Sequence, residues 1–493
     1  MIAYDTAEWL LENNQNNIIS HASLTEPEMI AYDLTNVTGP TYLYLYQRLK
    51  EDVVSGKIPP GTKLPSKRNL ARNLGVSSIT VENAYGQLRS EGYVHSEPKR
   101  GYFVSELVAV ASSGTMKSMP TLKRENVEAP ELFDLSSNMP ETDCFPFSVW
   151  SKLMRKTLAG KKERLLKASE GAGIVELRRA IANHLASYRG MEVDPDQVIV
   201  GAGTEYLYGL IVNLLGREKR YCVENPGYRK SKQVYESAGA TCVYAGMDEM
   251  GIKPDAVRKV GADVVHISPT HHFPTGIAMP ASRRYELLAW ASEKDGRFII
   301  EDDYDSEFRT SGRPISPFYN IDVCEKVVYM NTFSKSLAPT IRIGYMVLPW
   351  RLVDQYREKL GFYASTVSTF EQRTLAAFVS QGYFEKHVNR MRLHYGRKRK
   401  QVMEILRDRL PEERCKIIEN DSGLHFNIRF DVAATDAEIQ TKLRDAGIAI
   451  RTVGEYCLDD QPQNLRLFIL NYSSVDLERL PDAIETVRKV LGF

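Results

Sequence analysis

Two apolar runs that each end in chemically reactive side chains constrain the fold of this 493-residue chain most strongly. The run Phe298–Ile300 leads into Glu-Asp-Asp-Tyr-Asp at 301–305, and the run Val327–Met330 leads into Asn-Thr-Phe-Ser-Lys at 331–335. Short apolar runs of this kind are typical of strands buried on both faces, as in parallel sheets covered by helices. Since functional side chains gather at the carboxyl ends of such strands, the pattern predicts an α/β domain with a polar site there.

A third strand is predicted at Val198–Val200, followed by the small residues Gly-Ala-Gly-Thr at 201–204 and a helix from Glu205 to about Leu215. A helix N-terminus after such a turn can bind phosphate through its free backbone N–H groups. Alone, this motif is better explained by an ordinary tight turn, and Lys335 alone is better explained by an ordinary surface lysine. Together the motifs form one set, because a lysine can form a Schiff base and a carboxylate can keep a pyridinium nitrogen protonated.

Charge is distributed unevenly along the chain. The whole chain has 64 Lys and Arg against 63 Asp and Glu, which by itself argues against a nucleic-acid-binding protein. Residues 1–40, however, contain six acids and no Lys or Arg, whereas residues 41–105 contain ten bases and five acids. Since a phosphate backbone responds to local charge, residues 41–105 are a candidate DNA-binding segment. The alternative is a basic, solvated surface without a partner.

The periodicity of the basic segment predicts a winged helix-turn-helix. Apolar residues at helical spacing between 43 and 53 indicate a first helix. Ser66 is a candidate N-cap for a second helix that ends at Gly75, and Ser77 is a candidate N-cap for a third. Residues 93–104 alternate like a hairpin, which would be the wing. A structural three-helix domain that binds no DNA is the alternative.

In a helix-turn-helix the N-terminal part of the third helix reads base edges in the major groove. The residues expected to do so are Ser77, Ser78, Thr80 and Asn83. Basic side chains give affinity through phosphates without reading sequence. The residues expected in that role are Lys67, Arg68, Arg72, Lys99 and Arg100.

This segment closely resembles the GntR-type winged helix. The resemblance rests on Leu-Pro-Ser-Lys-Arg at 64–68, Leu-Gly-Val-Ser at 74–77, Glu-Gly-Tyr at 91–93 and Gly-Tyr-Phe-Val at 101–104. The family usually has Arg directly after the Val-Ser pair, where this chain has Ser78. The operator sequence therefore does not follow from the resemblance.

The region from about 132 to 493 resembles fold-type-I pyridoxal-phosphate (PLP) aminotransferases, and the whole chain resembles the MocR-type transcriptional regulators. The resemblance implies that Lys335 is the lysine of the internal aldimine. It also implies that Asp302 faces the pyridine nitrogen, that Tyr304 faces the ring hydroxyl and that Tyr228 stacks on the ring. The residues matching the phosphate-binding group are Gly203, Thr204, Thr332, Ser334 and Arg342.

Two further segments bear on the ligand. Arg466 in Leu-Arg-Leu at 465–467 matches the arginine that pairs with an amino-acid carboxylate, the alternative being a surface arginine on an edge strand. Residues 268–276 read Ser-Pro-Thr-His-His-Phe-Pro-Thr-Gly, with Phe273 where aminotransferases carry a cofactor-binding Asn. This change favours a regulator over a metabolic enzyme. His271 and His272 lack a third ligand at metal spacing, so we expect no metal site.

The motifs divide the chain into an acidic leader at 1–38, a winged helix at 39–105, a flexible linker at 106–131 and an aminotransferase-like domain at 132–493. Within the last, we expect a large subdomain at about 165–370 and a small one at 132–164 plus 371–493. The leader repeats Met-Ile-Ala-Tyr-Asp at 1–5 and 29–33, which indicates either a local duplication or two translation starts.

These features predict a PLP-dependent transcriptional regulator that binds promoter DNA and senses a small amine, an amino acid or PLP itself. The alternatives are an aminotransferase that carries a DNA-binding domain, and a DNA-binding module whose aminotransferase fold serves only for dimerisation. The resemblance implies a homodimer in which the winged helix of one chain lies over the other chain. The scattered cysteines and the absence of a signal or membrane-spanning pattern predict a cytoplasmic protein. The resemblance to the MocR-type regulators implies a bacterial protein that is associated with the nucleoid through its function.

Overall fold

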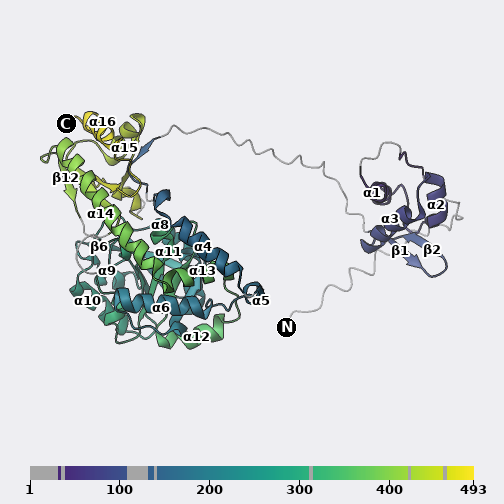
Figure 1. Cartoon of the computed structure of the whole chain (residues 1–493), viewed down its shortest axis with the longest axis horizontal. Helices are drawn as coiled ribbons and strands as arrows, with labels where there is room; N and C mark the ends of the chain where they lie inside the picture. Colours follow the sequence, from purple (N-terminus) through teal and green to yellow (C-terminus); the bar gives the residue numbers. More distant parts are fainter. Residues whose placement is uncertain are drawn as a thin grey trace, which may run out of the picture. The chain divides into compact units, whose positions relative to one another are not determined.

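The computed structural model of the chain describes residues 31–34, 39–107, 132–137, 141–160, 162–309, 315–419, 423–458 and 464–493. The chain divides into two compact units, Met1–Asn126 and Val127–Phe493 (Figure 1). Most of the predicted leader and nearly all of the predicted linker lie outside the described residues. In the described part of the chain, no helix is long and apolar enough to span a membrane.

The first unit is a winged helix-turn-helix, as predicted. Ser66 and Ser77 both act as N-caps, since their hydroxyl oxygens accept from the backbone N–H groups of Asn69 and Thr80 at 3.2 and 3.1 Å. Gly75 ends the second helix in the left-handed conformation, with φ 66°. The elements are α1 (Thr41–Val54), α2 (Lys67–Leu74), α3 (Ser78–Ser90), β1 (Val94–Glu97) and β2 (Gly101–Val104).

The core of this unit explains why the helices pack in this way. One face of α3 is buried, and its inward residues are Val81, Ala84, Tyr85 and Leu88. The Tyr85 hydroxyl donates to the Pro65 carbonyl at 3.0 Å, which ties α3 to the turn before α2. The β1 and β2 strands pair in antiparallel register from Val94 opposite Val104 to Glu97 opposite Gly101, forming the predicted wing.

The second unit is built on an eight-stranded sheet in the order β4-β11-β10-β9-β8-β5-β6-β7. The central pairs β10–β9, β9–β8, β8–β5 and β5–β6 are parallel, and the outer pairs are antiparallel. The three strands predicted from apolar runs are all present. The strands are β4 (Val198–Gly201), β5 (Arg220–Asn225), β6 (Thr241–Asp248), β7 (Gly251–Ile252), β8 (Val264–Ile267), β9 (Phe298–Asp302), β10 (Val327–Thr332) and β11 (Gly344–Val347).

Helices cover both faces of this sheet, so alternate residues of one strand enter different cores. In β10, Val328 and Met330 pack on the side of α7, whereas Tyr329 packs with α6 and α13. The covering helices are α4 (Phe147–Leu158), α5 (Lys162–Leu166), α6 (Val175–Arg189), α7 (Thr204–Leu215), α8 (Arg229–Ser237), α9 (Pro254–Lys259), α10 (Ala281–Ser292), α12 (Trp350–Leu360) and α13 (Thr369–Ser380).

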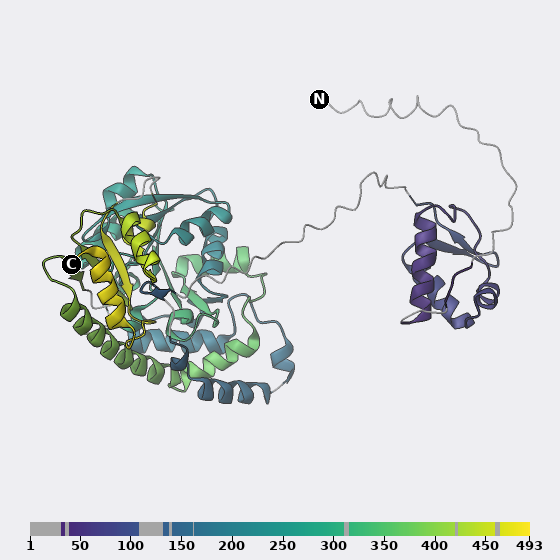
Figure 2. The ribbon, with the colours of Figure 1, turned by 90° about the horizontal axis from the view of Figure 1, so that it is seen from above.

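A smaller sheet in the order β12-β13-β16-β15 packs against the long helix α14, which leads to it from the helical layer near α13 (Figure 2). A two-stranded parallel pair, β14–β3, joins Ile448 to Phe133. Helices α4 and α13, although in ranges predicted for the small subdomain, pack with α6 on the larger core. The elements are β3 (Phe133–Asp134), α14 (Tyr383–Arg409), β12 (Cys415–Ile418), β13 (His425–Phe430), α15 (Asp436–Asp445), β14 (Ile448–Ala449), β15 (Arg451–Thr452), β16 (Leu467–Asn471) and α16 (Leu480–Leu491).

Candidate functional site

A cavity of about 500 Å³ opens beside the carboxyl ends of β9 and β10. Most of the residues predicted from the sequence line it together, although they come from segments up to 138 positions apart in the chain. Those residues are Thr204, Tyr228, Asp302, Tyr304, Thr332, Ser334, Lys335 and Arg342. The site-forming edge of the sheet is therefore the one that the sequence predicts.

Lys335 lies in α11 (Phe333–Ser336), a short helix that begins directly after β10. Thr332 caps this helix, because its hydroxyl oxygen accepts from the Ser334 N–H at 3.1 Å. Burial lowers the pKa of the Lys335 ammonium, and the nearby charge of Asp305 opposes the shift. A lowered pKa increases the fraction of neutral amine, which is the form that attacks an aldehyde carbon.

Asp302 ends β9 and presents one carboxylate oxygen without a partner. Its Oδ2 accepts from the Tyr208 hydroxyl at 2.5 Å and lies 3.4 Å from His266 Nε2. Its Oδ1 is buried and has no hydrogen-bond partner in the described part of the chain. Since a buried carboxylate oxygen is costly when unpaired, this atom fits a ligand that brings an N–H group, such as a protonated pyridine ring.

The part of the cavity beside the N-terminus of α7 is suited to an anion. Gly203, with φ 86°, precedes α7, and a Cβ at this position would lie 2.9 Å from Arg342 Nη2. The glycine thus lets the guanidinium approach the helix N-terminus, where free N–H groups and the helix dipole favour negative charge. The Ser334 hydroxyl donates to the Ile341 carbonyl at 2.8 Å, and Thr332 Oγ1 lies 3.4 Å from the Ile343 carbonyl.

Two charged residues at this anion-binding end were missed by the sequence analysis. Glu205, the second residue of α7, lines the cavity, and its Oε1 lies 2.5 Å from Lys230 Nζ and 3.8 Å from Arg342 Nη2. Spacing along the chain gives no signal for this triad, because α7, α8 and the loop before β11 meet only in the folded sheet.

Aromatic side chains form one wall of the cavity. Tyr228 precedes α8, is 51% exposed, and meets Phe273 edge-to-face at 6.4 Å between ring centroids. Phe273 also packs edge-to-face on Tyr456 at 4.9 Å. Tyr304 donates its hydroxyl to the His271 carbonyl at 3.1 Å, and burial raises its pKa, so the phenol stays protonated.

The two adjacent histidines of the 268–276 segment bond to neighbouring protein groups. His271 Nδ1 lies 2.7 Å from Asp305 Oδ2, and His272 Nδ1 lies 2.7 Å from Thr275 Oγ1. Burial lowers the pKa of His272 to about 3, so its ring is neutral. Both rings therefore support the loop that carries Phe273.

Arg466 is not brought to this cavity. It precedes β16 with φ 51°, and its backbone N–H donates to Asp436 Oδ1 at 2.9 Å. Arg451 lines the cavity in its place, with Nη1 3.3 Å from the Tyr456 hydroxyl. Arg451 pairs with Ile469, three residues after Arg466, and successive residues of a strand point to opposite faces of the sheet. The sequence signal for Arg451 was only its position after the apolar run 448–450.

A buried ionic network that the sequence analysis missed lies behind the site. Arg189 Nη2 lies 2.6 Å from Asp303 Oδ2, and both side chains are almost fully buried. The Tyr329 hydroxyl donates to the same oxygen at 2.7 Å. Because Asp303 directly follows Asp302 at the end of β9 and continues the extended backbone, one side chain points toward the cavity and the other into this network. Burial raises the pKa of two carboxyls in the network, Glu301 to about 7 and Glu307 to about 8.

The first unit presents a second candidate site along α2 and α3. Arg68, Arg72, Ser78, Asn83 and Lys99 are exposed, as expected for DNA contacts. Thr80 is half-buried, and its hydroxyl lies 2.8 Å from that of Ser77.

Two of the predicted phosphate-binding bases already have acidic neighbours. Lys67 Nζ lies 2.6 Å from Glu82 Oε1, and Arg100 forms an ion pair with Glu97. The sequence analysis also missed Ile79, an apolar side chain that is 68% exposed in the first turn of α3. Isolated apolar side chains are common on surfaces, but this one lies among the predicted base-reading residues.

Comparison with known proteins agrees with both units. Residues 41–104 match the family of bacterial regulatory proteins of the gntR family, and residues 130–484 match aminotransferase class I and II. The fold resembles that of the kynurenine aminotransferase of Pyrococcus horikoshii, with a TM-score of 0.65 and 24% identity over 74% of this chain and 92% of that chain.

Two curated relatives share both units. The uncharacterized HTH-type transcriptional regulator YdeL of Bacillus subtilis is 36% identical over 84% of this chain and 89% of its own length. The probable rhizopine catabolism regulatory protein MocR of Rhizobium meliloti is 30% identical over 91% of this chain and 93% of its own length.

The fold, the site and these matches define a class: DNA-binding regulators that combine a GntR-type helix-turn-helix with an aminotransferase class I and II domain. Within that class, the chain belongs to the MocR-type transcriptional regulators. The aminotransferase family implies pyridoxal 5′-phosphate as the cofactor. The cavity fits this group, because it offers a buried lysine, an unpartnered buried carboxylate oxygen and an arginine at a glycine-preceded helix N-terminus.

Proposed function

We propose that this regulator holds PLP through Lys335 and that a primary-amine effector entering the same cavity changes its affinity for promoter DNA. One observation carries the proposal: Lys335, the unpartnered Asp302 Oδ1 and Arg342 lie around a single cavity. When bound, PLP supplies an aldehyde that reacts reversibly with primary amines. If the protein binds promoter DNA as proposed, it is located with the chromosome, in the cytoplasm.

Each side chain has a separate task in this proposal. Lys335 would provide the amine for the aldehyde carbon, and Asp302 Oδ1 would accept the ring N–H and keep that nitrogen protonated. Tyr304 would turn its hydroxyl from the His271 carbonyl toward the ring hydroxyl, and Tyr228 would cover one face of the ring. The phosphate would be held by Gly203, Thr204, Thr332, Ser334 and Arg342.

The cavity favours an amino acid over a simple amine as effector. Arg451 reaches the cavity from the small sheet, and its exposed guanidinium can pair with a carboxylate there. The planar guanidinium suits bidentate binding of a carboxylate. We therefore assign the carboxylate-binding role, which the family resemblance suggested for Arg466, to Arg451.

The test is a screen of amino acids and amines for their effect on binding of promoter DNA by the PLP-loaded protein. For the amino acid with the strongest effect, Arg451→Gln is expected to raise the concentration that gives half of the effect by about tenfold or more, as for loss of a charged hydrogen bond. Arg466→Gln is the control and is expected to change it little. An equal effect of both variants, or none of Arg451→Gln, would contradict the assignment.

A second candidate function is slow transamination. The observation that favours it is the lowered pKa of Lys335, because a neutral amine beside the cofactor can also move protons. Repeated turnover of an amino acid with a 2-oxoacid at rates typical of enzymes would make the protein an aminotransferase that carries a DNA-binding domain.

We also propose that the protein acts as a homodimer. Large apolar side chains remain exposed near the cavity's phosphate end, among them Phe362 and Tyr363. The adjoining Ala364 bridges to Glu170, and Thr366 accepts from the Ala202 N–H beside the helix N-terminus. Exposed apolar residues beside a site are typical of an interface. The exchange of winged helices between the two chains is part of this proposal.

Two substitutions on the DNA-binding unit are expected to act differently. Arg72→Ala should weaken binding to all duplexes and lower the slope of log affinity against log salt by about 1, because a phosphate contact is lost. Ile79→Ala should leave the salt slope unchanged. It should weaken binding only to duplexes that carry a thymine at one position per half-site, because the lost contact is with the thymine methyl group. Fluorescence anisotropy with duplexes selected from a random pool measures both. The same salt slope for Arg72→Ala and the wild type would contradict the phosphate role.

A further inference from the structure

An acidic side chain occupies the anion-binding end of the cavity. Glu205 is the second residue of α7 and lines the cavity, and its carboxylate lies 2.5 Å from Lys230 Nζ and 3.8 Å from Arg342 Nη2. Its side chain is 43% exposed. A carboxylate in the first turn is stabilised by the helix dipole, so the local structure favours this position without any ligand.

The same features that favour Glu205 here also favour a phosphate. Arg342 approaches the N-terminus of α7 across Gly203, and the free N–H groups of the first turn belong to the same helix end. A phosphate bound there carries a charge close to −2 and would share Arg342 with the Glu205 carboxylate. Two anions that share one arginine repel each other, and the cost grows as solvent is displaced.

Lys230 reduces this repulsion but does not remove it. Its ammonium pairs closely with Glu205, and burial at this cavity edge is slight, so the pair is solvated. The three side chains together carry a net charge of +1, compared with the +2 that Arg342 and Lys230 would present alone. Glu205 therefore lowers the positive charge that the cavity offers to a phosphate.

We propose that Glu205 weakens the hold on the phosphate of PLP, so that the cofactor exchanges with solution and its occupancy follows the PLP concentration. The proposal rests on the proposed binding of PLP in this cavity. It adds a regulatory consequence, because the fraction of the protein that carries PLP then reports the PLP concentration. The Glu205 carboxylate thus weakens phosphate binding, whereas the residues around it strengthen phosphate binding.

The test compares the affinities of the full-length protein for PLP and for pyridoxal, which lacks the phosphate. Glu205→Gln is expected to bind PLP about tenfold more tightly, the size of a like-charge interaction of about 1.4 kcal/mol at a solvated site, and to leave pyridoxal unchanged. Glu205→Asp keeps the charge and should stay within about threefold of the wild type. Equilibrium dialysis and titration of the Schiff-base absorbance give the dissociation constants.

Glu236→Gln is the matched control. Glu236 Oε1 lies 2.8 Å from Lys232 Nζ, on the same helix that carries Lys230. Glu236 is not among the residues that line the cavity. It should leave the affinities for PLP and pyridoxal at wild-type values. An unchanged or weaker PLP affinity in Glu205→Gln would overturn the inference, and so would an equal gain for pyridoxal. If neither compound binds the wild type or any variant, the proposed PLP site itself fails.

Discussion

Replacing Lys335 by alanine is expected to abolish the visible Schiff-base absorbance of the protein incubated with PLP. Among the described residues that line the cavity, Lys335 is the buried primary amine. Lys230, the other lysine in this lining, is exposed and pairs with Glu205. The effect of amino acids on DNA binding should disappear in the same variant. Absorbance spectra and a DNA-binding titration with and without PLP measure both results.

Two variants separate loss of the amine from general damage. Lys335→Arg keeps a positive charge but cannot form the Schiff base, so it should lose the absorbance as alanine does. Lys326→Ala removes another buried lysine, whose ammonium donates to backbone carbonyls of Lys294 and Asp295, and should keep the absorbance. Persistence of the band in both Lys335 variants would show that the amine lies elsewhere. Without any Schiff base in the wild type, the aminotransferase fold would serve only for dimerisation.

Replacing Arg189 by methionine is expected to lower the free energy of unfolding of the second unit by about 3–5 kcal/mol. The substitution removes the cation but leaves Asp303 buried, with only the Tyr329 hydroxyl donating to its Oδ2. An uncompensated buried carboxylate is costly because it has lost its hydration. Urea unfolding followed by tryptophan fluorescence measures the change, since Trp150, Trp290 and Trp350 all lie in this unit.

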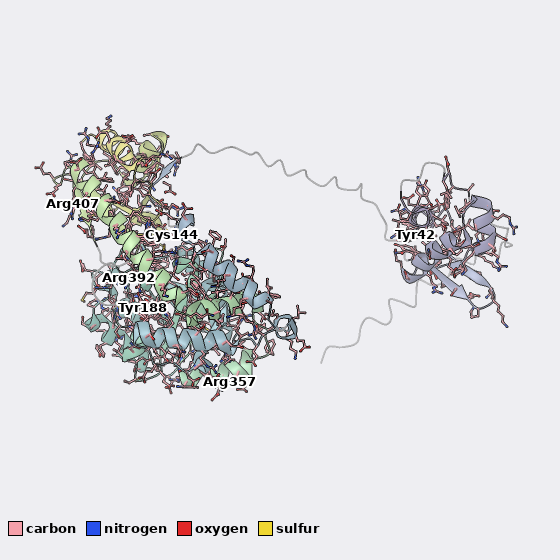
Figure 3. The ribbon with its side chains drawn as sticks, in the orientation of Figure 1. Tyr42, Cys144, Tyr188, Arg357, Arg392 and Arg407 are labelled. Carbon is pink, nitrogen blue, oxygen red and sulfur yellow. The ribbon has the colours of Figure 1, made fainter. Side chains whose placement is uncertain are left out.

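An exposed ion pair provides the control for Arg189. Arg357 lies on the surface of the second unit, labelled in Figure 3, and pairs with Asp196 at 2.9 Å. Because both side chains are about half exposed, Arg357→Met should cost less than about 1 kcal/mol. Adding Asp303→Asn to Arg189→Met should recover part of the loss by removing the unpaired charge. If Arg189→Met lowers the free energy of unfolding no more than Arg357→Met does, the stabilising role of the buried Arg189–Asp303 pair is contradicted.

The Arg189–Asp303 pair also bears on the candidate site. It holds Asp303 on the side of the strand away from the cavity, and strand alternation then directs Asp302 toward Tyr208 and the cavity. We therefore expect Arg189→Met to weaken PLP binding by loosening β9, in addition to lowering stability. Asp302, which lines the cavity, is therefore positioned partly by Asp303 beside it.

Much of the architecture was predictable because local signals were strong. The caps at Ser66 and Ser77, the stop at Gly75 and the hairpin at residues 93–104 need only neighbouring residues to form. The apolar runs before Asp302 and Lys335 predicted buried strands, because only a helix-covered sheet hides both faces of a strand.

The errors and omissions in the candidate site share one cause. Arg451 lies in β15 and Arg466 lies directly before β16, and the sequence could not show which face of the small sheet meets the cavity. Glu205, Lys230 and Arg342 come from three different segments and meet only through the order of strands in the large sheet.

By itself the sequence determined the class of each unit and the strands that carry the site. It also determined the lysine, acid and glycine motifs at the ends of those strands. All of these features depend on periodicity and on short-range backbone geometry. Only the tertiary structure decided which arginine reaches the cavity and which acid lies beside Arg342 at the N-terminus of α7. Those choices depend on strand register and on packing between distant segments, and neither is encoded in local spacing.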